Sequence, residues 1–484
     1  MPEVLSQPDS KAASLKPLCV DLDGTLVKSD TLVDSLLVLA RTRPLLLLPL
    51  LGTLLRGKAA FKAFVTSHVE LDVAHLPYNR KLLHFLQQER ARGRQLCLAT
   101  GADVRLGERI AHHLGIFSAV LGSDGNTNLT GHRKLASLQK QFGEGGFAYI
   151  GNETADMPLL STASEAMLAN PSTALRSRIR KSRIAPSHVF EERTHPIRSL
   201  LNALRPHQWA KNLLIFLPPL LAHDRSLSVL ANAFLAFFCF CCTASATYLI
   251  NDLLDIEADR RSTRKSQRPF ASGDLPPATG LIAAAALLIV GFAVSRALPL
   301  EFLFWLVFYV ASTLAYSLYL KRVPIVDVLA LSGLYTLRLL AGGAATHTPI
   351  SHWLAGFAIF LFLSLAIAKR FAELEEIRLT GKQLKNGRGY LMSDIEQIRS
   401  FGTASAFAAV VVFANYISSQ DVIRLYRNPR SLWLIVPFMI LWLCRVWLLA
   451  SRGELDEDPV AFALTDPLSL FIGIVVLAFV LIAI

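Results

Sequence analysis

Two rhythms of apolar and polar residues divide the chain. Up to about residue 185, short apolar runs alternate with helical stretches, and the runs fall at residues 17–20, 95–99, 119–122, 147–150 and 166–169. Short buried strands that alternate with helices are typical of a parallel α/β sheet. After about residue 195 the apolar runs approach the roughly 20 residues that a membrane-spanning helix needs. We therefore expect an α/β, Rossmann-like domain at residues 1–185 and an all-α, multi-span membrane domain at residues 186–484.

The membrane domain contains nine candidate spans, at about residues 208–223, 228–250, 279–297, 300–320, 325–345, 351–369, 400–419, 431–450 and 467–484. Basic residues are concentrated in loops 251–275, 321–322 and 369–388, which fall on one side when the spans alternate. The positive-inside rule makes that side cytoplasmic, and it also receives the N-terminal domain. The basic residues at 424–430 and the acids at 454–458 do not follow this rule. We expect a multi-pass protein of a bacterial-type inner (plasma) membrane with a cytoplasmic N-terminal domain.

A helical insertion is predicted between Lys28 and Gly93. Inside it, residues 44–55 are almost wholly apolar and have basic residues on both flanks, at positions 41, 43, 56 and 58. This segment is too short to span a bilayer. It is interpreted either as an interfacial segment that rests the domain on an anionic membrane or as a buried helix of the insertion. Residues 171–195 are rich in Ser, Arg, Lys and Pro without apolar periodicity, and predict a linker or a surface helix.

Composition narrows the class of protein. Of the 484 residues, 52% are hydrophobic, which exceeds what one soluble domain normally carries. The net charge is +12, but many cations flank apolar runs, where the positive-inside rule and anionic lipid account for them. A nucleic-acid partner is therefore not implied. The six cysteines lack paired metal-ligand spacing, so neither a disulfide framework nor a zinc site is expected.

Polar residues directly follow several predicted strands. Asp21 and Asp23 follow the first strand in the motif Asp-Leu-Asp-Gly-Thr-Leu, Thr100 follows the second, and Asp156 follows the fourth after a short loop. In parallel α/β sheets, function gathers at the carboxyl ends of the strands. Together with the downstream Lys134, this pattern resembles the haloacid dehalogenase superfamily of phosphatases, in which an insertion such as 28–93 forms a helical cap.

The resemblance implies a Mg²⁺-dependent phosphatase with defined roles for these residues. Asp21 would be the nucleophile that forms an aspartyl-phosphate, and Asp23 would be the general acid and base. Thr100 would hold the phosphoryl group and Lys134 would offset its charge. Asp156, with Asp21 and Asp23, would contact Mg²⁺.

One position departs from that superfamily. Asn152 stands where the last motif usually has an aspartate, and a neutral amide is a weaker metal ligand than a carboxylate. A degenerate domain with a regulatory or scaffolding role is therefore the alternative to an active phosphatase.

A second acidic cluster follows the apolar run at 228–250. If the helix continues, Asn251, Asp252, Asp255 and Asp259 share one face. Neighbouring carboxylates repel one another unless they bind a cation, and Mg²⁺ commonly bridges such carboxylates to substrate phosphates. The alternative is a solvated helix end whose acids pair with Arg260, Arg261 and Arg264.

The spacing Asn-Asp-x-x-Asp-x-x-x-Asp at a span end, the nine spans and the following basic loop resemble the UbiA superfamily of intramembrane prenyltransferases over residues 196–484. In that superfamily two acidic motifs hold Mg²⁺ on a diphosphate. The second motif departs here, since Asp327 is followed four residues later by Leu331 and three turns later by Arg338. An arginine within a span is costly, so Arg338 is a functional candidate, and helix geometry predicts that it lies close to the face of Asp327. Asp252, Asp255, Asp259 and Asp327 are the candidate Mg²⁺ ligands.

This departure, with Arg-Pro-His-Gln-Trp-Ala-Lys-Asn at residues 205–212, resembles the decaprenyl-phosphate phosphoribosyltransferase branch of that superfamily. The branch transfers 5-phosphoribose from phosphoribosyl diphosphate to a polyprenyl phosphate lipid. Both reactants are anionic, so the site needs cations in addition to the metal. Candidate substrate-binding residues are Asn251, Lys211, Arg261, Lys321, Arg322 and Arg338. For Lys321, Arg322 and Arg261, anchoring at the membrane edge is the alternative.

Two other functions compete with this interpretation. One is ordinary prenyl transfer from a polyprenyl diphosphate to an aromatic acceptor. The other is a transporter or a non-enzymatic scaffold, but transporter sites usually lie near the midplane between repeated halves, and no internal repeat is evident. The fusion gives weak support to phosphoribosyl transfer, because the expected product keeps a 5-phosphate that a phosphatase domain could remove.

Overall fold

The computed structural model describes residues 15–192, 194–380, 388–455, 462–463 and 465–484. Lys382 and Lys385 of the expected basic loop lie outside these ranges, as do residues 456–458 of the acidic stretch. The chain forms two compact units. The first combines Met1–Ala203 with Asp252–Ile282, and the second combines Leu204–Asn251 with Ala283–Ile484. The first unit therefore includes a segment that follows the expected domain boundary by more than sixty residues.

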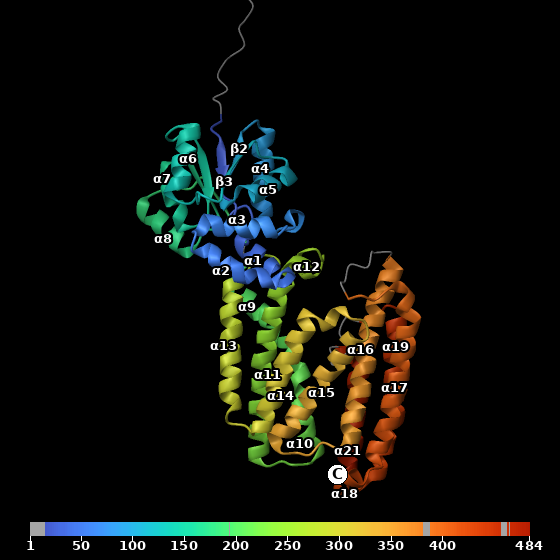
Figure 1. Ribbon diagram of the computed structural model, residues 1–484. Helices are drawn as coiled ribbons and strands as arrows, with labels where there is room; N and C mark the ends of the chain where they lie inside the picture. The colour runs from blue at the N-terminus through green and yellow to red at the C-terminus, as the bar shows by residue number, and fades with distance from the viewer. Residues whose placement is uncertain (1–14, 193, 381–387, 456–461, 464) are drawn as a thin grey trace, which may run out of the picture. The chain divides into compact units, whose positions relative to one another are not determined.

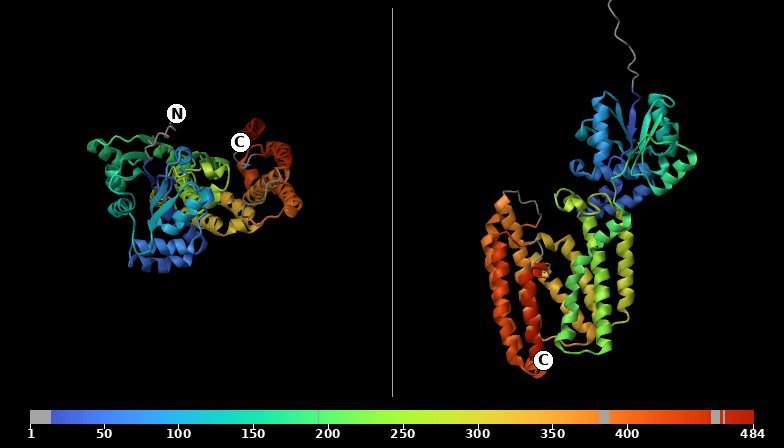
Figure 2. Two further views of the ribbon diagram at one scale, coloured as in Figure 1. Left: turned by 90° about the horizontal axis from the view of Figure 1, so that it is seen from above. Right: turned by 180° about the vertical axis from the view of Figure 1, so that it is seen from behind.

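A six-stranded parallel sheet forms the centre of the first unit (Figures 1 and 2). Its strand order is β3-β2-β1-β4-β5-β6. The strands are β1 Leu18–Val20, β2 Leu96–Asp103, β3 Ala119–Ser123, β4 Ala148–Gly151, β5 Glu165–Ala169 and β6 His188–Phe190. The five predicted strands are confirmed. The sixth lies within residues 171–195, where a linker or a surface helix was expected. That stretch contains such a helix, α8 Thr173–Ser182, and the sheet continues past residue 185.

Helices cover both faces of this sheet (Figure 2). The strands show why. In β1, Leu18 and Val20 join the core on one face, whereas Cys19 joins the core on the other, as the two-residue period of a strand requires. A strand that is apolar on both faces must be covered on both. The helices are α1 Thr31–Thr42, α2 Leu47–Leu54, α3 Lys58–His68, α4 Arg80–Ala91, α5 Val104–Leu114, α6 His132–Phe142, α7 Met157–Thr162, α8 Thr173–Ser182 and α9 Pro196–Leu204.

The insertion between Lys28 and Gly93 is helical, as predicted, and contains α1 to α4. Its apolar segment forms a short 3₁₀ helix, Pro44–Leu46, followed by α2. Leu50 is the buried residue of α2, while most of the other leucines of the segment are exposed. The interpretation of this segment as a buried helix is therefore wrong for the side of α2 that carries the exposed leucines.

The acidic stretch does not form one continuous helix. α11, Leu227–Leu254, ends just before Asp255, and the short α12, Ile256–Arg260, begins just after it. Asp255 caps α12 with φ −98° and ψ 7°, which lies outside the helical range. The single helix face expected for the four polar residues is therefore interrupted at Asp255.

Apolar helices make up the second unit. Seven helices among the described residues are long and apolar enough to cross a membrane, which makes the chain a multi-pass membrane protein. The predicted count of nine spans is not confirmed. The first predicted span is a 3₁₀ helix, Pro206–Phe216, followed by α10, Leu217–Leu221, and the last is the shorter α21, Pro467–Ala483. The remaining helices are α13 Pro277–Ser295, α14 Leu300–Leu318, α15 Val326–Thr346, α16 His352–Thr380, α17 Ile395–Ile417, α18 Gln420–Leu425 and α19 Ile435–Ser451.

The helix α15 is central to the packing of the second unit. It packs against α14, α16, α10 and the 3₁₀ helix Pro206–Phe216. Gly342 permits the last of these contacts, because a Cβ atom there would lie 2.3 Å from the carbonyl oxygen of Ile215. A glycine at this position brings the 3₁₀ helix close to α15, and thereby places residues 205–212 beside the polar side chains of α15.

Candidate functional sites

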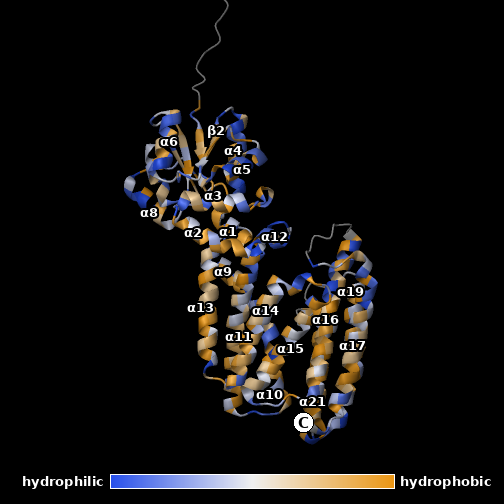
Figure 3. Cartoon of the chain, in the orientation of Figure 1, coloured by the Kyte–Doolittle hydropathy of each residue, from blue (hydrophilic) through white to orange (hydrophobic). Residues whose placement is uncertain are grey.

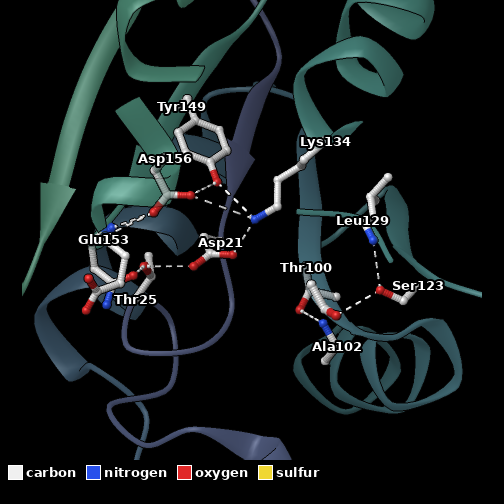
Figure 4. A network of polar contacts seen from close by, with 12 residues as sticks. Asp21, Thr25, Thr100, Ala102, Ser123, Leu129, Lys134, Tyr149, Glu153 and Asp156 are labelled. Carbon is white, nitrogen blue, oxygen red and sulfur yellow. Dashed lines mark hydrogen bonds and ion pairs between the residues drawn. The ribbon is translucent and has the colours of Figure 1, made fainter. Parts of the chain in front are cut away.

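Charged residues from several elements meet at the carboxyl end of β1 (Figure 4). The Nζ atom of Lys134, on α6, donates to Oδ1 of Asp21 at 2.7 Å and lies 3.9 Å from Oδ1 of Asp156. It also lies 3.2 Å from the hydroxyl of Tyr149, on β4. All four side chains are buried. The structure thus brings together two strand-end residues, Asp21 and Asp156, and Lys134, which the resemblance implied. It adds Tyr149, which carries no sequence signal because it resembles any core residue of a strand.

Asp156 is held by several donors. Its carboxylate accepts hydrogen bonds from the Tyr149 hydroxyl at 2.9 Å and from the backbone amides of Asn152 and Glu153, each at 3.1 Å. Asn152 lies against the loop that follows β1, where its Oδ1 accepts from Thr25. A Cβ atom at Gly24 would lie 2.1 Å from Nδ2 of Asn152, and Gly24 has a φ of +73°. Asn152 is therefore a packing partner of the Asp-Leu-Asp-Gly-Thr loop.

Asp23 and Thr100 lie beside this cluster. The backbone amide of Thr31 donates to Oδ1 of Asp23 at 2.8 Å. Desolvation raises the pKa of Asp23 to about 7, and the neighbouring charge of Asp30 adds to the rise. Burial raises the pKa of Asp21 to about 6 in spite of the opposing effect of Lys134. Thr100 is fully buried, and its hydroxyl accepts from the amide of Ala102 (Figure 4).

A lysine of the insertion also reaches the sheet edge. The Nζ atom of Lys62, on α3, donates to the carbonyl oxygen of Gly101 at 2.6 Å and to Oδ1 of Asn128 at 2.8 Å. Desolvation lowers the pKa of Lys62. No sequence pattern indicates this contact, because a lysine in a helical insertion is ordinary. Lys62 therefore links the insertion to the segment after Thr100.

The acids of the second cluster meet a cation that the sequence did not single out. Nη1 of Arg268 donates to Oδ1 of Asp252 at 3.1 Å and to Oδ2 of Asp259 at 2.7 Å. Both aspartates are buried, and burial raises the pKa of Asp259 to about 6 against the opposing effect of Arg268. Asp255 instead lies 3.4 Å from Nη1 of Arg41, on α1. These acids are thus paired with cations, and two of those cations, Arg268 and Arg41, were not among the arginines expected.

Two of the expected partner arginines, Arg260 and Arg261, contact the insertion. Arg260 is buried and donates to Oδ2 of Asp34 at 2.8 Å and to the Ser29 hydroxyl at 3.0 Å. Arg261, a candidate for substrate binding, is half exposed and donates to Asp72 at 2.7 Å and to Glu257 at 2.8 Å. The segment after α11 is therefore held against the N-terminal sheet domain by ion pairs along its length.

Asp327 forms a buried ion pair in the second unit. Nε of Arg370, on α16, donates to Oδ2 of Asp327 at 2.5 Å, and the hydroxyl of Tyr390 donates to Oδ1. Arg370 also contacts Glu373 at 2.7 Å and Tyr316 at 3.2 Å. Lys321 and Arg322 lie in the short 3₁₀ helix Leu320–Arg322, and neither side chain is buried. Both oxygens of Asp327 thus have protein partners.

Arg338 lies elsewhere on α15. Its Nε donates to Oδ1 of Asn212 at 2.9 Å, its Nη2 to the hydroxyl of Tyr309 at 3.1 Å, and its Nη1 to the carbonyl oxygen of Leu334 at 2.5 Å. Arg338 and Lys211 both lie over the ring of Tyr335, at 5.6 Å and 5.5 Å from its centre. Arg338 and Asp327 are about 16 Å apart along the helix, at about 1.5 Å per residue. They share a face, as predicted, but bind different neighbours.

Carboxylates that could bind a divalent cation come together in pairs. Among the residues that the structure describes, no group of three or more acidic, histidine or cysteine side chains is arranged around one point. Two pairs of carboxylates nevertheless converge on a single cationic nitrogen: Asp21 and Asp156 on Lys134, and Asp252 and Asp259 on Arg268. Converging carboxylate oxygens suit Mg²⁺ chemically. Both pairs therefore offer ligand oxygens of the kind that Mg²⁺ takes.

Comparison with known proteins places the chain in a family. The model of the UbiA prenyltransferase family matches residues 213–475. An uncharacterized protein of Sinorhizobium fredii, y4nM, is 38% identical over 94% of this chain and 89% of its own length. Decaprenyl-phosphate phosphoribosyltransferase of Mycolicibacterium smegmatis is 34% identical over 46% of this chain and 72% of its own length. A solved UbiA homolog of Archaeoglobus fulgidus, bound to DMAPP and Mg²⁺, covers 58% of this chain and 96% of its own at 19% identity and a TM-score of 0.46.

The matched residues include most of the apolar helices, the acidic stretch after α11, and both Asp327 and Arg338. The match covers more than half of the chain. The chain therefore belongs to the UbiA prenyltransferase family and is a multi-pass membrane transferase.

Proposed function

We propose that the membrane part transfers 5-phosphoribose from phosphoribosyl diphosphate to the phosphate of a polyprenyl lipid. The hydrogen bond between Arg338 and Asn212 carries the proposal. It joins the two features, 126 residues apart, on which the resemblance to the phosphoribosyl-transferring branch rests: the arginine after the incomplete second acidic motif, and the stretch 205–212. The identity to a decaprenyl-phosphate phosphoribosyltransferase supports the same assignment.

The environment of Arg338 favours an anionic ligand. Its hydrogen-bond partners are an amide, a phenol and a backbone carbonyl, all of them neutral, and the side chain is buried within a span. A buried cation without a neutralising acid is costly unless an anion joins it. Lys211 lies over the same tyrosine ring and brings a second positive charge to this region. Two cations suit a reaction between two phosphorylated reactants better than transfer to an aromatic acceptor, which needs fewer.

The reaction has a simple balance of bonds. An oxygen of the lipid phosphate attacks the anomeric carbon of the ribose, a new carbon–oxygen bond forms, and the bond between that carbon and the diphosphate breaks. Asp252, Asp255 and Asp259 would hold Mg²⁺, which would offset the negative charge of the departing diphosphate. In this proposal Arg268 releases Asp252 and Asp259 when substrate binds, and its guanidinium becomes available to the diphosphate. Arg338 and Lys211 hold an anionic group of a reactant in place.

Paired assays on membranes that contain the chain test the donor. One assay supplies labelled phosphoribosyl diphosphate with polyprenyl phosphate, and the other supplies polyprenyl diphosphate with an aromatic acid. We expect labelled lipid in the first assay only, and its loss in Asp255→Ala. Arg338→Met should lower the rate about 100-fold or more, because a charge-assisted contact to phosphate is removed. Product in the second assay only would establish ordinary prenyl transfer instead.

We propose a second activity, that of a haloacid dehalogenase-type phosphatase, for the N-terminal sheet domain, which would face the cytoplasm. The meeting of Asp21, Lys134 and Asp156 supports it, as does the raised pKa of Asp23, which suits an acid and base near neutral pH. A carboxylate oxygen of Asp21 attacks phosphorus, the phosphorus–oxygen ester bond breaks, and Asp23 gives its proton to the leaving oxygen. Water then attacks the phosphorus of the aspartyl-phosphate and gives a proton to Asp23, and the bond between phosphorus and the Asp21 oxygen breaks, which releases phosphate and restores the carboxylate.

The 5-phosphate of the ribosyl lipid is the substrate we propose for this domain. Purified chain should release inorganic phosphate from that lipid, whereas Asp21→Asn should not, while both should still form the lipid in the transferase assay. Equal release by both proteins would contradict the phosphatase and leave a regulatory or scaffolding domain.

A further inference from the structure

The leucine segment, residues 44–55 of the insertion, presents an apolar face that no described part of the chain covers. Leu45, Leu48 and Leu55 are 81%, 72% and 92% exposed, and Leu51 is exposed as well. These residues follow one another at intervals of three and four, so they line one face of the segment. Figure 3 shows α2 in the colour of hydrophobic residues. An exposed face of this kind marks an interaction site rather than an ordinary protein surface.

The inner face of the same segment accounts for its fold. Leu50 is buried, and Leu46 packs against the core on one side of the sheet. Burial of these two leucines fixes the segment against its domain, and the remaining leucines must then point outward. An outer face that met only water would gain nothing from leucine at each of these positions.

Cations flank the leucine face on both sides. Arg43 lies before it, and Arg56 and Lys58 lie after it; all three are exposed. No acidic residue occurs between positions 35 and 69. An apolar face bordered by exposed cations matches the boundary between the acyl chains and the anionic headgroups of a bilayer.

One hydrogen bond connects this region to the end of a membrane span. Nη1 of Arg41 donates to the carbonyl oxygen of Leu254 at 3.1 Å, and Leu254 is the last residue of α11. α11 is one of the helices that can cross the membrane. The leucine segment begins three residues after Arg41, so it starts close to the end of α11.

We propose that the leucine segment is an interfacial membrane helix, which inserts its outer face into the surface of the bilayer and contacts anionic headgroups through its flanking cations. The chain is then bound to the membrane at two places, by the spans of its transferase part and by the surface of its N-terminal domain. This proposal is independent of either reaction proposed above.

Fluorescence quenching in lipid nanodiscs tests the proposal on the full-length chain. Cys444 is the exposed one of the six free cysteines, so every variant carries Cys444→Ser before a labelling site is added. A fluorophore is attached through Leu48→Cys or Leu55→Cys on the outer face. The matched control is Glu108→Cys, at an exposed position on α5 of the same domain. The quencher is a nitroxide on a shallow position of the lipid acyl chain.

We expect the labels at 48 and 55 to lose about half of their emission, because an interfacial helix inserts its apolar face roughly 5–10 Å into the boundary region. The label at 108 should keep its emission. If the labels at 48 and 55 are quenched no more than the label at 108, the proposal is overturned, whether they then contact water, another helix or a second copy of the chain.

A second pair of variants tests the headgroup contact. Quenching at position 48 should be stronger in nanodiscs with phosphatidylglycerol than in phosphatidylcholine alone, and Arg43→Gln with Arg56→Gln should remove that difference. Quenching that is equal in the two lipids before these substitutions would overturn the assignment of anionic headgroups.

Discussion

At the scale of single residues, Asp327 is a motif residue whose carboxylate is held in a buried ion pair. The sequence marked it as the remaining acid of an incomplete metal motif. The structure gives it a guanidinium on one oxygen and a phenol on the other, at a site with no exposure. Loss of one partner from a buried ion pair leaves an uncompensated charge, which costs more than the pair itself contributes.

We therefore expect Asp327→Ala to destabilise the chain by about 3–5 kcal/mol, the usual cost of breaking a buried pair. Thermal unfolding of the purified protein in detergent measures this. The double variant Asp327→Ala with Arg370→Met should recover part of the loss, because it removes the charge left behind. A single variant that unfolds at the temperature of the unaltered chain would show that Asp327 has no such structural role.

Asn152 offers a second test at this scale. It packs over Gly24 and accepts a hydrogen bond from Thr25, and an aspartate of the same shape could keep that contact. Asn152→Asp adds a carboxylate beside Asp21 and Asp156. If the N-terminal domain is the phosphatase we propose, the Mg²⁺ concentration for half-maximal phosphate release should fall about tenfold, a typical effect for groups that support a metal site. The control is Asn152→Ala, and an aspartate variant with the metal dependence of the alanine variant would contradict the expectation.

At the scale of elements, apolar periodicity was informative where a segment is buried on its own account. The strands β1 to β5 are apolar on both faces and were predicted, whereas β6, His188–Phe190, is short and partly exposed and was missed. Periodicity also failed at Asp255, because the helical spacing of the acids continues through the break between α11 and α12. That break accompanies contacts with distant residues, Arg41 and Asp34, that no local pattern contains.

The same limit applies to the candidate sites. The convergence of Asp21 and Asp156 followed from the rule on strand ends, since the topology of a parallel sheet brings these positions together. Lys134, on α6, was expected there only from the superfamily resemblance. The pairing of Arg268 with Asp252 and Asp259 did not follow from any such rule, because it depends on how a loop folds back. In the sequence Asn212 is only the last residue of the stretch 205–212, and its hydrogen bond to Arg338 depends on the packing of two separate helices.

The loop after α12 provides a prediction at the scale of elements. Arg260 is buried against Asp34 and Ser29, and Gly273, with φ +75°, lies so close to Lys28 that a Cβ atom would be 2.8 Å from its side chain. Arg260→Met should therefore raise amide hydrogen exchange in residues 26–35 and 255–274 by 100-fold or more, since about 3 kcal/mol or more of local stability is lost. The exposed Arg264 supplies the control, Arg264→Met. Unchanged exchange in both segments would refute the role of Arg260.

At the scale of the whole molecule, the first unit is built from two separate stretches of chain. Residues 252–282 leave the membrane part and complete the unit formed by the N-terminal residues. The predicted boundary at residue 185 would cut this unit. β6 lies after that boundary, and so does Arg260, the ion-pair partner of the buried Asp34. A sequence that is scanned for linkers does not reveal a domain whose last piece follows a membrane span.

A fragment of residues 1–203 should consequently be incomplete. We expect it to bind a synthetic peptide of residues 253–276 and to gain thermal stability from it, because the peptide restores the partner of Asp34. A peptide with Arg260→Met should bind at least tenfold more weakly. The measurement is a thermal shift against peptide concentration, and equal effects of the two peptides would show that the segment contributes no specific contact.

The two-part construction of the first unit also sets an order of events during synthesis. Residues 204–251 must be made and α11 inserted before residues 252–282 become available, which takes a few seconds at about 5–20 residues per second. Residues 252–282 can reach the N-terminal residues only if α11 ends on the side of the membrane where the N-terminal residues already are. Completion of the N-terminal unit thus reports that α11 was inserted in the correct direction, and a wrongly inserted chain would keep an unfinished domain that quality-control proteases can recognise.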